Sequence, residues 1–166
     1  MRTLLWTRIA TVIFGIVPGL LSGACAAEQL DITRCYSGTS TMIDNGKEIM
    51  PVLSWEDSGI IMSNSSNKIL NGAVAHEAGV QRGLGEERIG YGLLKIVDND
   101  GDTIIVGGPY TGFSGTWNFL EGTGKWKGVE GSLHSERVVA NDPKRPAMPG
   151  TYQTCRHETV TFQLVK

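Results

Sequence analysis

The chain has 166 residues, and its 15 lysines and arginines against 17 aspartates and glutamates give a formal net charge of −2. This length suits a single domain, and the slightly acidic balance argues against nucleic acid as a partner, because phosphate binding needs clustered positive charge. The 22 glycines are about twice the ordinary share of roughly 7 %, which favours short strands and tight turns.

Residues 1–27 have the order of a secretory signal peptide. Arg2 and Arg8 supply positive charge, and the apolar run over 9–21 is too short to span about 30 Å of hydrocarbon. Small residues over 22–27 then lead to Glu28, as signal peptidase requires. We therefore expect export to the periplasm or the exterior, with one mature domain over 28–166. An uncleaved anchor and a lipoprotein acylated at Cys25 are the alternatives.

Loss of the two signal arginines would leave a mature net charge of about −4. No long apolar run would remain, so a membrane span in the mature chain is not expected. Cys35 and Cys155 would be its two cysteines, and in an oxidising compartment they are predicted to form a disulfide. A reactive or metal-binding thiol is the alternative, but the chain has no CxxC motif to support it.

Period-2 alternation predicts about eight strands. The C-terminal one is clearest, with Val160, Phe162 and Leu164 on one face. The turn over 98–102 separates two strands as a hairpin, whereas 73–87 could be loop or short helix and 141–149 reads as a loop. The predicted strands cover 32–43, 52–63, 69–76, 88–97, 103–106, 114–120, 125–139 and 151–165.

Short strands joined by short turns indicate an all-β fold, either a closed antiparallel β-barrel or a compact sandwich. Closure of a barrel removes exposed strand edges. A disulfide between Cys35 in the first strand and Cys155 in the last suits a barrel, because there the terminal strands are neighbours.

The segment from Gly115 to Gly131 carries a recognisable pattern, a small-residue turn followed by an aromatic residue and Gly-x-x-Gly. It resembles the G-G-T/S-G-x-F-x-G-x-x-G stretch of the allene oxide cyclase and dirigent barrel superfamily, with Trp126 in place of Phe and Glu121 in place of the first Gly. Gly122 and Gly124 would allow positive φ in a tight turn.

The resemblance implies an eight-stranded barrel whose apolar interior holds a flexible ligand in one shape. Members of this superfamily cyclise an unstable fatty-acid epoxide or steer phenoxy-radical coupling, and bacterial barrels of similar build include cyclases of polyketide-like chains. The family's catalytic acid lies on an early strand that gives no match here, so no catalytic residue is carried over.

The candidate acid/base residues are His76 with Glu77, and His134 with Glu130. Each pair includes a group suited to proton transfer near neutral pH. The alternative is a solvated loop for the first pair and an exposed strand face for the second, and the choice depends on which strand faces point inward.

Four aromatic residues, Trp55, Tyr91, Trp117 and Trp126, are candidates for the wall of a ligand pocket or for plain core packing. The acidic turn over 98–102 resembles half of a calcium loop, but Pro109 stands where an EF-hand needs its bidentate acid. A hairpin turn is therefore favoured, and no metal or cofactor is predicted.

Three functions are consistent with these patterns. The first is an exported β-barrel that binds a small, mostly apolar molecule in its interior. The second is a cyclase or isomerase acting on such a molecule, which leaves the assignment as an enzyme open. The third is an inhibitor-like module that binds another protein through the 141–149 loop. The sequence leaves the oligomeric state and the ligand's identity undetermined.

Overall fold

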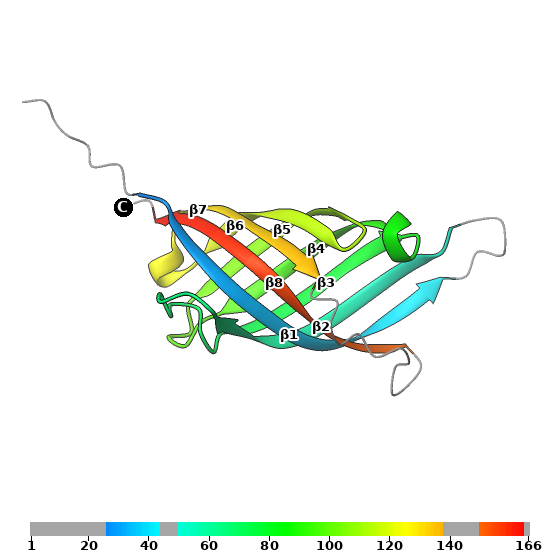
Figure 1. Cartoon of the computed structure of the whole chain (residues 1–166), viewed down its shortest axis with the longest axis horizontal. Helices are drawn as coiled ribbons and strands as arrows, with labels where there is room; N and C mark the ends of the chain where they lie inside the picture. Colours follow the sequence, from blue (N-terminus) through cyan, green and yellow to red (C-terminus); the bar gives the residue numbers. More distant parts are fainter. Residues whose placement is uncertain (1–25, 44–49, 138–149, 165–166) are drawn as a thin grey trace, which may run out of the picture.

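The computed structural model describes residues 26–43, 50–137 and 150–164, so the predicted signal segment lies outside them except for its last two residues. Eight antiparallel strands follow one another around a closed barrel, and β8 returns to pair with β1 (Figure 1). The strands are β1 (Glu28–Ile43), β2 (Val52–Ser63), β3 (Val74–Arg82), β4 (Ile89–Val97), β5 (Thr103–Thr111), β6 (Ser114–Gly122), β7 (Val129–Arg137) and β8 (Thr151–Leu164).

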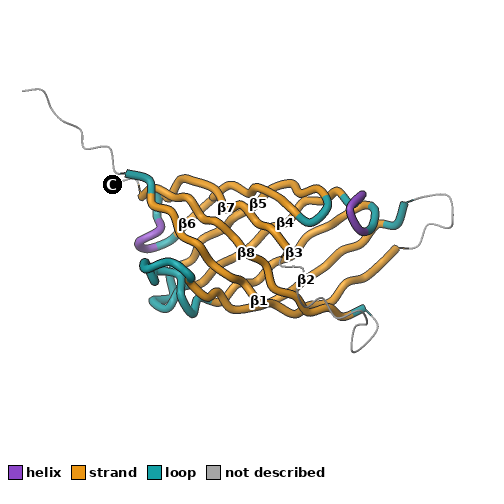
Figure 2. Tube along the Cα trace, in the orientation of Figure 1, coloured by secondary structure: helices purple, strands orange, loops and turns teal. Residues whose placement is uncertain are grey.

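The all-β fold predicted from the alternation is confirmed, and of the two predicted alternatives it is the closed barrel and not the sandwich. Figure 2 shows the strands forming the wall, with the turns and two short 3-10 helices, η1 (Gly85–Glu87) and η2 (Gly124–Trp126), at the barrel ends. No apolar helix of membrane-spanning length occurs in the part of the chain that the structure describes.

The largest departure from the predicted strands is β3. It was expected over 69–76 but runs over Val74–Arg82, inside a stretch that alternation left open between loop and helix. Its small residues Ala75 and Gly79 face inward, so the strand lacks the apolar alternation that would have revealed it. The predicted strand over 125–139 is likewise shorter, because residues 124–126 form η2.

The predicted disulfide closes the seam between the first and last strands. Cys35 and Cys155 are directly opposite each other in the β1–β8 ladder, with their Cα atoms 4.0 Å apart. Their neighbours Arg34 and Arg156 point into the barrel, so the disulfide lies on its outer face. The bond therefore ties together strands that are 120 positions apart in the sequence.

The half of the barrel where β1 begins and β8 ends is filled by apolar side chains. Strand residues such as Ile32, Leu94 and Phe162 are almost fully buried there. Leu70, from the β2–β3 turn, and Trp126, from η2, close this end, and Trp126 packs edge-on against Phe162 at 5.5 Å between ring centroids. No space for a ligand is expected in a half packed this way.

The acidic turn over 98–102 is a hairpin in which both carboxylate oxygens of Asp98 accept hydrogen bonds. Asp98 accepts hydrogen bonds from the backbone N–H groups of Asp100 and Asp102 and from the Trp126 indole at 2.6 Å. Lys125 Nζ lies 2.9 Å from Asp98 Oδ2. These contacts lower the pKa of Asp98 against the opposing effect of its burial. The turn thus fastens η2 onto the closed end instead of presenting free carboxylates.

Two glycines of the segment that resembles the dirigent superfamily serve this closure in different ways. Gly124 has the predicted positive φ, at 51°. Gly122 does not have a positive φ. Glycine is required at this position because a Cβ would collide with the backbone of Trp126.

Candidate functional site

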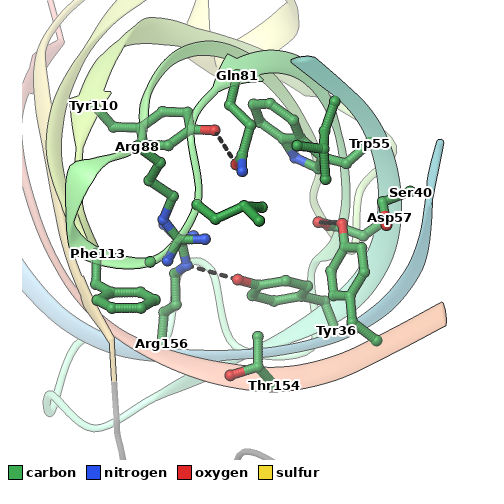
Figure 3. A pocket seen from close by; sticks show the side chains of 14 residues that line it. Tyr36, Ser40, Trp55, Asp57, Gln81, Arg88, Tyr110, Phe113, Thr154 and Arg156 are labelled. Atoms are coloured by element: carbon green, nitrogen blue, oxygen red, sulfur yellow. Dashed lines mark hydrogen bonds between the residues drawn. The ribbon is translucent and has the colours of Figure 1, made fainter. Parts of the chain in front are cut away.

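The other end of the barrel contains a pocket of about 360 Å³, a size at the lower end of the range for small-molecule sites. Side chains from β1, β2, β3, β5 and β8 and from the β3–β4 and β5–β6 turns surround it (Figure 3). Its aromatic lining consists of Tyr36, Trp55, Tyr110, Phe113 and Tyr152. Its polar lining includes Ser40, Asp57, Gln81, Arg88, Thr154 and Arg156.

Glycines on β3 and β4 leave the room that these rings occupy. A Cβ at Gly79 would fall on the Trp55 ring, and a Cβ at Gly90 would fall on the Tyr110 ring. The two rings meet edge to face at 5.5 Å between centroids. The Tyr110 hydroxyl donates a 2.8 Å hydrogen bond to Gln81 Oε1, so this wall of the pocket is held by packing and by a polar contact.

A buried ionic layer separates the pocket from the apolar half. Its centre is Arg34, whose Nη2 lies 2.6 Å from Glu77 Oε2 and 3.0 Å from Glu158 Oε1. Arg34 Nη1 lies 3.5 Å from Asp57 Oδ1. Burial alone would lower the pKa of Arg34, but Glu158 and Glu77 outweigh it and raise that pKa well above its ordinary value. Arg34 therefore stays charged and is matched by carboxylates.

Asp57 is the titratable group of this layer that also lines the pocket. Burial is the main cause that raises the pKa of Asp57 to about 7, and repulsion from Glu77 adds to it, whereas Arg34 opposes it. The Tyr152 hydroxyl donates a 2.8 Å hydrogen bond to Asp57 Oδ2. Burial also raises the pKa of Tyr152, so this hydroxyl keeps its proton. The raised pKa places the ionisation of the Asp57 carboxyl group near neutral pH, while Tyr152 remains a hydrogen-bond donor to it.

Arg156 lies on β8, beside Arg34 in the β1–β8 ladder, and its hydrogen bonds go to neutral oxygens. Its Nε donates a 2.6 Å hydrogen bond to the Tyr36 hydroxyl, and its Nη1 donates a 3.3 Å bond to Ser135 Oγ. Arg88, from the β3–β4 turn, donates from Nε to the Gly112 carbonyl at 2.6 Å, and its guanidinium lies over the Phe113 ring at 3.9 Å. Both guanidinium groups line the pocket.

Two of the residues proposed from the sequence belong to this site. Trp55 lines the pocket, and its indole N–H donates a 3.3 Å hydrogen bond to Glu77 Oε1. Glu77 lies behind the pocket wall, almost fully buried against Arg34. Trp117 and Trp126 are buried in the apolar core and do not line the pocket.

The remaining candidates lie on the outside of the barrel. His76 and His134 expose 47 % and 44 % of their side chains and contact the surface carboxylates of Glu56 and Glu136. Glu130 is also exposed. These groups therefore do not meet in one site. His76 and Glu77 point to opposite sides of β3, and on the described part of β7 Leu133 and Ser135 face inward, so that His134 faces outward.

Tyr91 is exposed on the outer face as well, at 46 %. In the first half of β4 the small residues face inward and the large ones outward. Gly90 and Gly92 face the interior, whereas Tyr91 and Leu93 face outward. The reason is steric: the inward glycines leave room for the rings of Tyr110 and Trp117.

Sequence reasoning missed most of the polar site residues. The sequence does contain a signal for them. Arg34 alternates with the apolar residues Ile32 and Tyr36, and Glu158 stands two positions before Val160, so each charge falls on the buried face of its strand. A charge in phase with a buried face indicates a buried ion pair, since an unpaired buried charge is too costly. Asp57 follows the same rule, two positions after Trp55.

Comparison with solved structures finds this barrel in two pterocarpan synthase dirigent proteins. GePTS1 superposes with a TM-score of 0.52 at 12 % identity, covering 95 % of this chain and 100 % of its own. PsPTS1 gives 0.51 at 13 % identity, covering 85 % and 97 %. The chain has the allene oxide cyclase/dirigent-like barrel fold.

A pyocyanin demethylase also superposes, with a TM-score of 0.47 at 16 % identity, covering 83 % of this chain and 100 % of its own. The sequence itself matches no protein-family model and no curated protein sequence. A shared fold does not by itself determine function, so function is argued from the pocket residues.

Chemically, the pocket offers aromatic faces for a flat ligand, two guanidinium groups on one side and a carboxyl group of near-neutral pKa on the other. This lining is more polar than the apolar interior that the sequence and its resemblance led us to expect. The apolar part of the interior is the half already filled by side chains.

Proposed function

We propose that the protein binds a small molecule with an aromatic body and polar substituents in the pocket at the open end of its barrel. The observation that carries the proposal is the division of the barrel interior into a packed apolar half and an open half of about 360 Å³. Rings in the open half offer stacking surfaces. The dirigent-like fold is compatible with such binding.

The proposal is tested by filling the pocket. Thr154 lines it from β8, whereas Thr161 of the same strand is exposed on the outer face. Thr154→Trp should abolish binding of a bicyclic aromatic probe, 2-naphthol, measured by saturation-transfer NMR. Thr161→Trp, the matched control, should leave it unchanged. Equal binding by the two variants would show that the probe binds elsewhere and would count against the pocket.

A second candidate function is catalysis of an isomerisation or cyclisation of the bound molecule. The observation that favours it is Asp57, which lines the pocket with its pKa raised to about 7 and can give or take a proton near neutral pH. Asp57→Asn should then abolish product formation from a candidate substrate, followed by mass spectrometry, while the variant still binds 2-naphthol. Retained product formation in Asp57→Asn would exclude this role.

We also propose that the protein is exported, with residues 1–27 removed. The support is the order of charge, apolar run and small residues in that segment, together with the disulfide between Cys35 and Cys155, which is typical of oxidising compartments. N-terminal sequencing of the protein made by its native host should start at Glu28. A chain that retains Met1 and fractionates with the cytoplasm would contradict export.

A further inference from the structure

Two arginines of the described barrel interior, Arg34 and Arg156, have different surroundings. Arg34 is surrounded by three carboxylates, those of Asp57, Glu77 and Glu158. Among the described residues, the hydrogen bonds of Arg156 go to two neutral hydroxyls, on Tyr36 and Ser135. The carboxylates of the ionic layer thus contact Arg34 directly, whereas Glu158 reaches the neighbouring Arg156 only through the Ser135 hydroxyl. The Arg156 guanidinium also forms part of the pocket wall.

Arg88 adds a second positive charge to the same pocket. Its guanidinium is positioned by the Gly112 carbonyl and by the Phe113 ring, both from the β5–β6 turn. Figure 3 shows Arg88 and Arg156 on the side of the pocket that carries Phe113, with Asp57 on the other side. Both arginines also act electrostatically on Tyr110. Two guanidinium groups therefore face the pocket from the same side.

We propose that the pocket selects an anionic aromatic ligand, with a carboxylate or similar planar oxyanion held by Arg88 and Arg156. This inference rests on the proposed binding function and names the ligand class for the same pocket. A guanidinium presents a planar set of N–H donors that matches a carboxylate. Arg156 uses only Nε and Nη1 for its contacts with the described chain, so donors remain for a ligand.

The opposite side of the pocket determines the orientation of such a ligand. Asp57 lies there with Glu77 behind the wall, and an anion placed beside these two carboxyl groups would be repelled. The anionic group is therefore directed to the arginines, while the ring occupies the space between Trp55 and Tyr36. The neutral edge of the ring then meets the Asp57–Tyr152 pair.

The test compares two probes of nearly the same shape, 2-naphthoate and the neutral 2-naphthamide, by isothermal titration calorimetry on the purified protein. A charge-assisted hydrogen bond should favour naphthoate by about tenfold or more. Raising the salt concentration should narrow the difference, because exposed charge interactions are screened. Equal affinities would overturn the anion inference and leave the proposed binding function standing. Binding of neither probe would count against both.

Variants assign the effect to the arginines. Arg88→Gln should weaken naphthoate by about tenfold and change naphthamide affinity less than about twofold. Arg156→Lys, which keeps the charge but loses the planar donor set, should weaken naphthoate by a smaller factor. Arg82→Gln, an exposed arginine at the end of β3, is the matched control and should change neither. Equal weakening of both probes by Arg88→Gln would overturn the inference, because it would mark a packing role.

Discussion

The hydroxyl of Tyr152 donates a 2.8 Å hydrogen bond to Asp57 Oδ2, which joins β8 to β2 over Gly38 of the intervening strand β1. This bond holds a carboxyl group with a near-neutral pKa beside the space where a ligand would lie. Arg34, Glu77 and Arg156 also act on Asp57, so its ionisation is set jointly by β1, β3 and β8.

The first prediction concerns the pH dependence of stability. Because burial raises the pKa of Asp57 from 3.8 to about 7, the folded state binds this proton more tightly than the unfolded state. The resulting stabilisation is present below about pH 4 and is lost as the pH rises to about 7. Asp57→Asn removes this titration. The free energy of unfolding of the variant minus that of the parent protein should therefore increase by about 2–4 kcal/mol from pH 4 to pH 8. Urea unfolding at both pH values measures it, and a pH-independent difference would contradict it.

The second prediction concerns the ionic layer. Arg34→Met should lower the free energy of unfolding by about 3–5 kcal/mol, because it leaves buried carboxylates without their cation. Arg82→Met, at an exposed site, should change it by no more than about 0.5 kcal/mol. Adding Glu77→Gln to Arg34→Met should recover part of the loss. If the Arg34 and Arg82 variants unfolded at the same urea concentration, the ionic layer would not contribute as described.

The third prediction concerns the seam between β1 and β8. Replacing Cys35 and Cys155 with serine should lower stability by about 2–5 kcal/mol, because the disulfide closes a loop of 120 positions. A reductant should lower the stability of the parent protein by a similar amount and leave the double variant unaffected. Equal urea midpoints for the oxidised parent and the double variant would show that the ladder hydrogen bonds alone hold the seam.

The fourth prediction concerns the space behind the pocket wall. Gly79→Ala would place a methyl group on the Trp55 ring, so we expect a loss of about 1–3 kcal/mol and a changed fluorescence spectrum from Trp55. Ala78→Val, at the neighbouring exposed position on the outer face, should change stability by no more than about 0.5 kcal/mol. An unchanged spectrum in Gly79→Ala would mean that the ring has room elsewhere.

The barrel was predictable because alternation and turn residues are local signals. The inward residues Val160 and Phe162, and the hairpin before Thr103, identified their strands directly. Pairing of Cys35 with Cys155 followed from cysteine number and from the expected adjacency of the end strands. Most of β3, beyond its first three residues, was not predicted because its inward positions are small or charged, including Ala75 and Glu77.

The site was less predictable because it depends on which face of each strand points inward. On β4, glycines rather than Tyr91 and Leu93 face the interior, so residue size alone gives the wrong face. The partners of Arg34 come from three other strands, and no spacing along the chain brings them together. Such contacts are fixed by the register of the closed barrel.

The most direct test of the pocket uses the indole N–H signals in a proton–nitrogen correlation NMR spectrum, with Trp55→Phe and Trp126→Phe to assign them. Trp55 lines the pocket, whereas Trp126 is buried at the closed end. Titration with 2-naphthol should shift the Trp55 signal in a saturable manner and leave the Trp126 signal in place. A stationary Trp55 signal with a shifting Trp126 signal would contradict binding at the open end of the barrel.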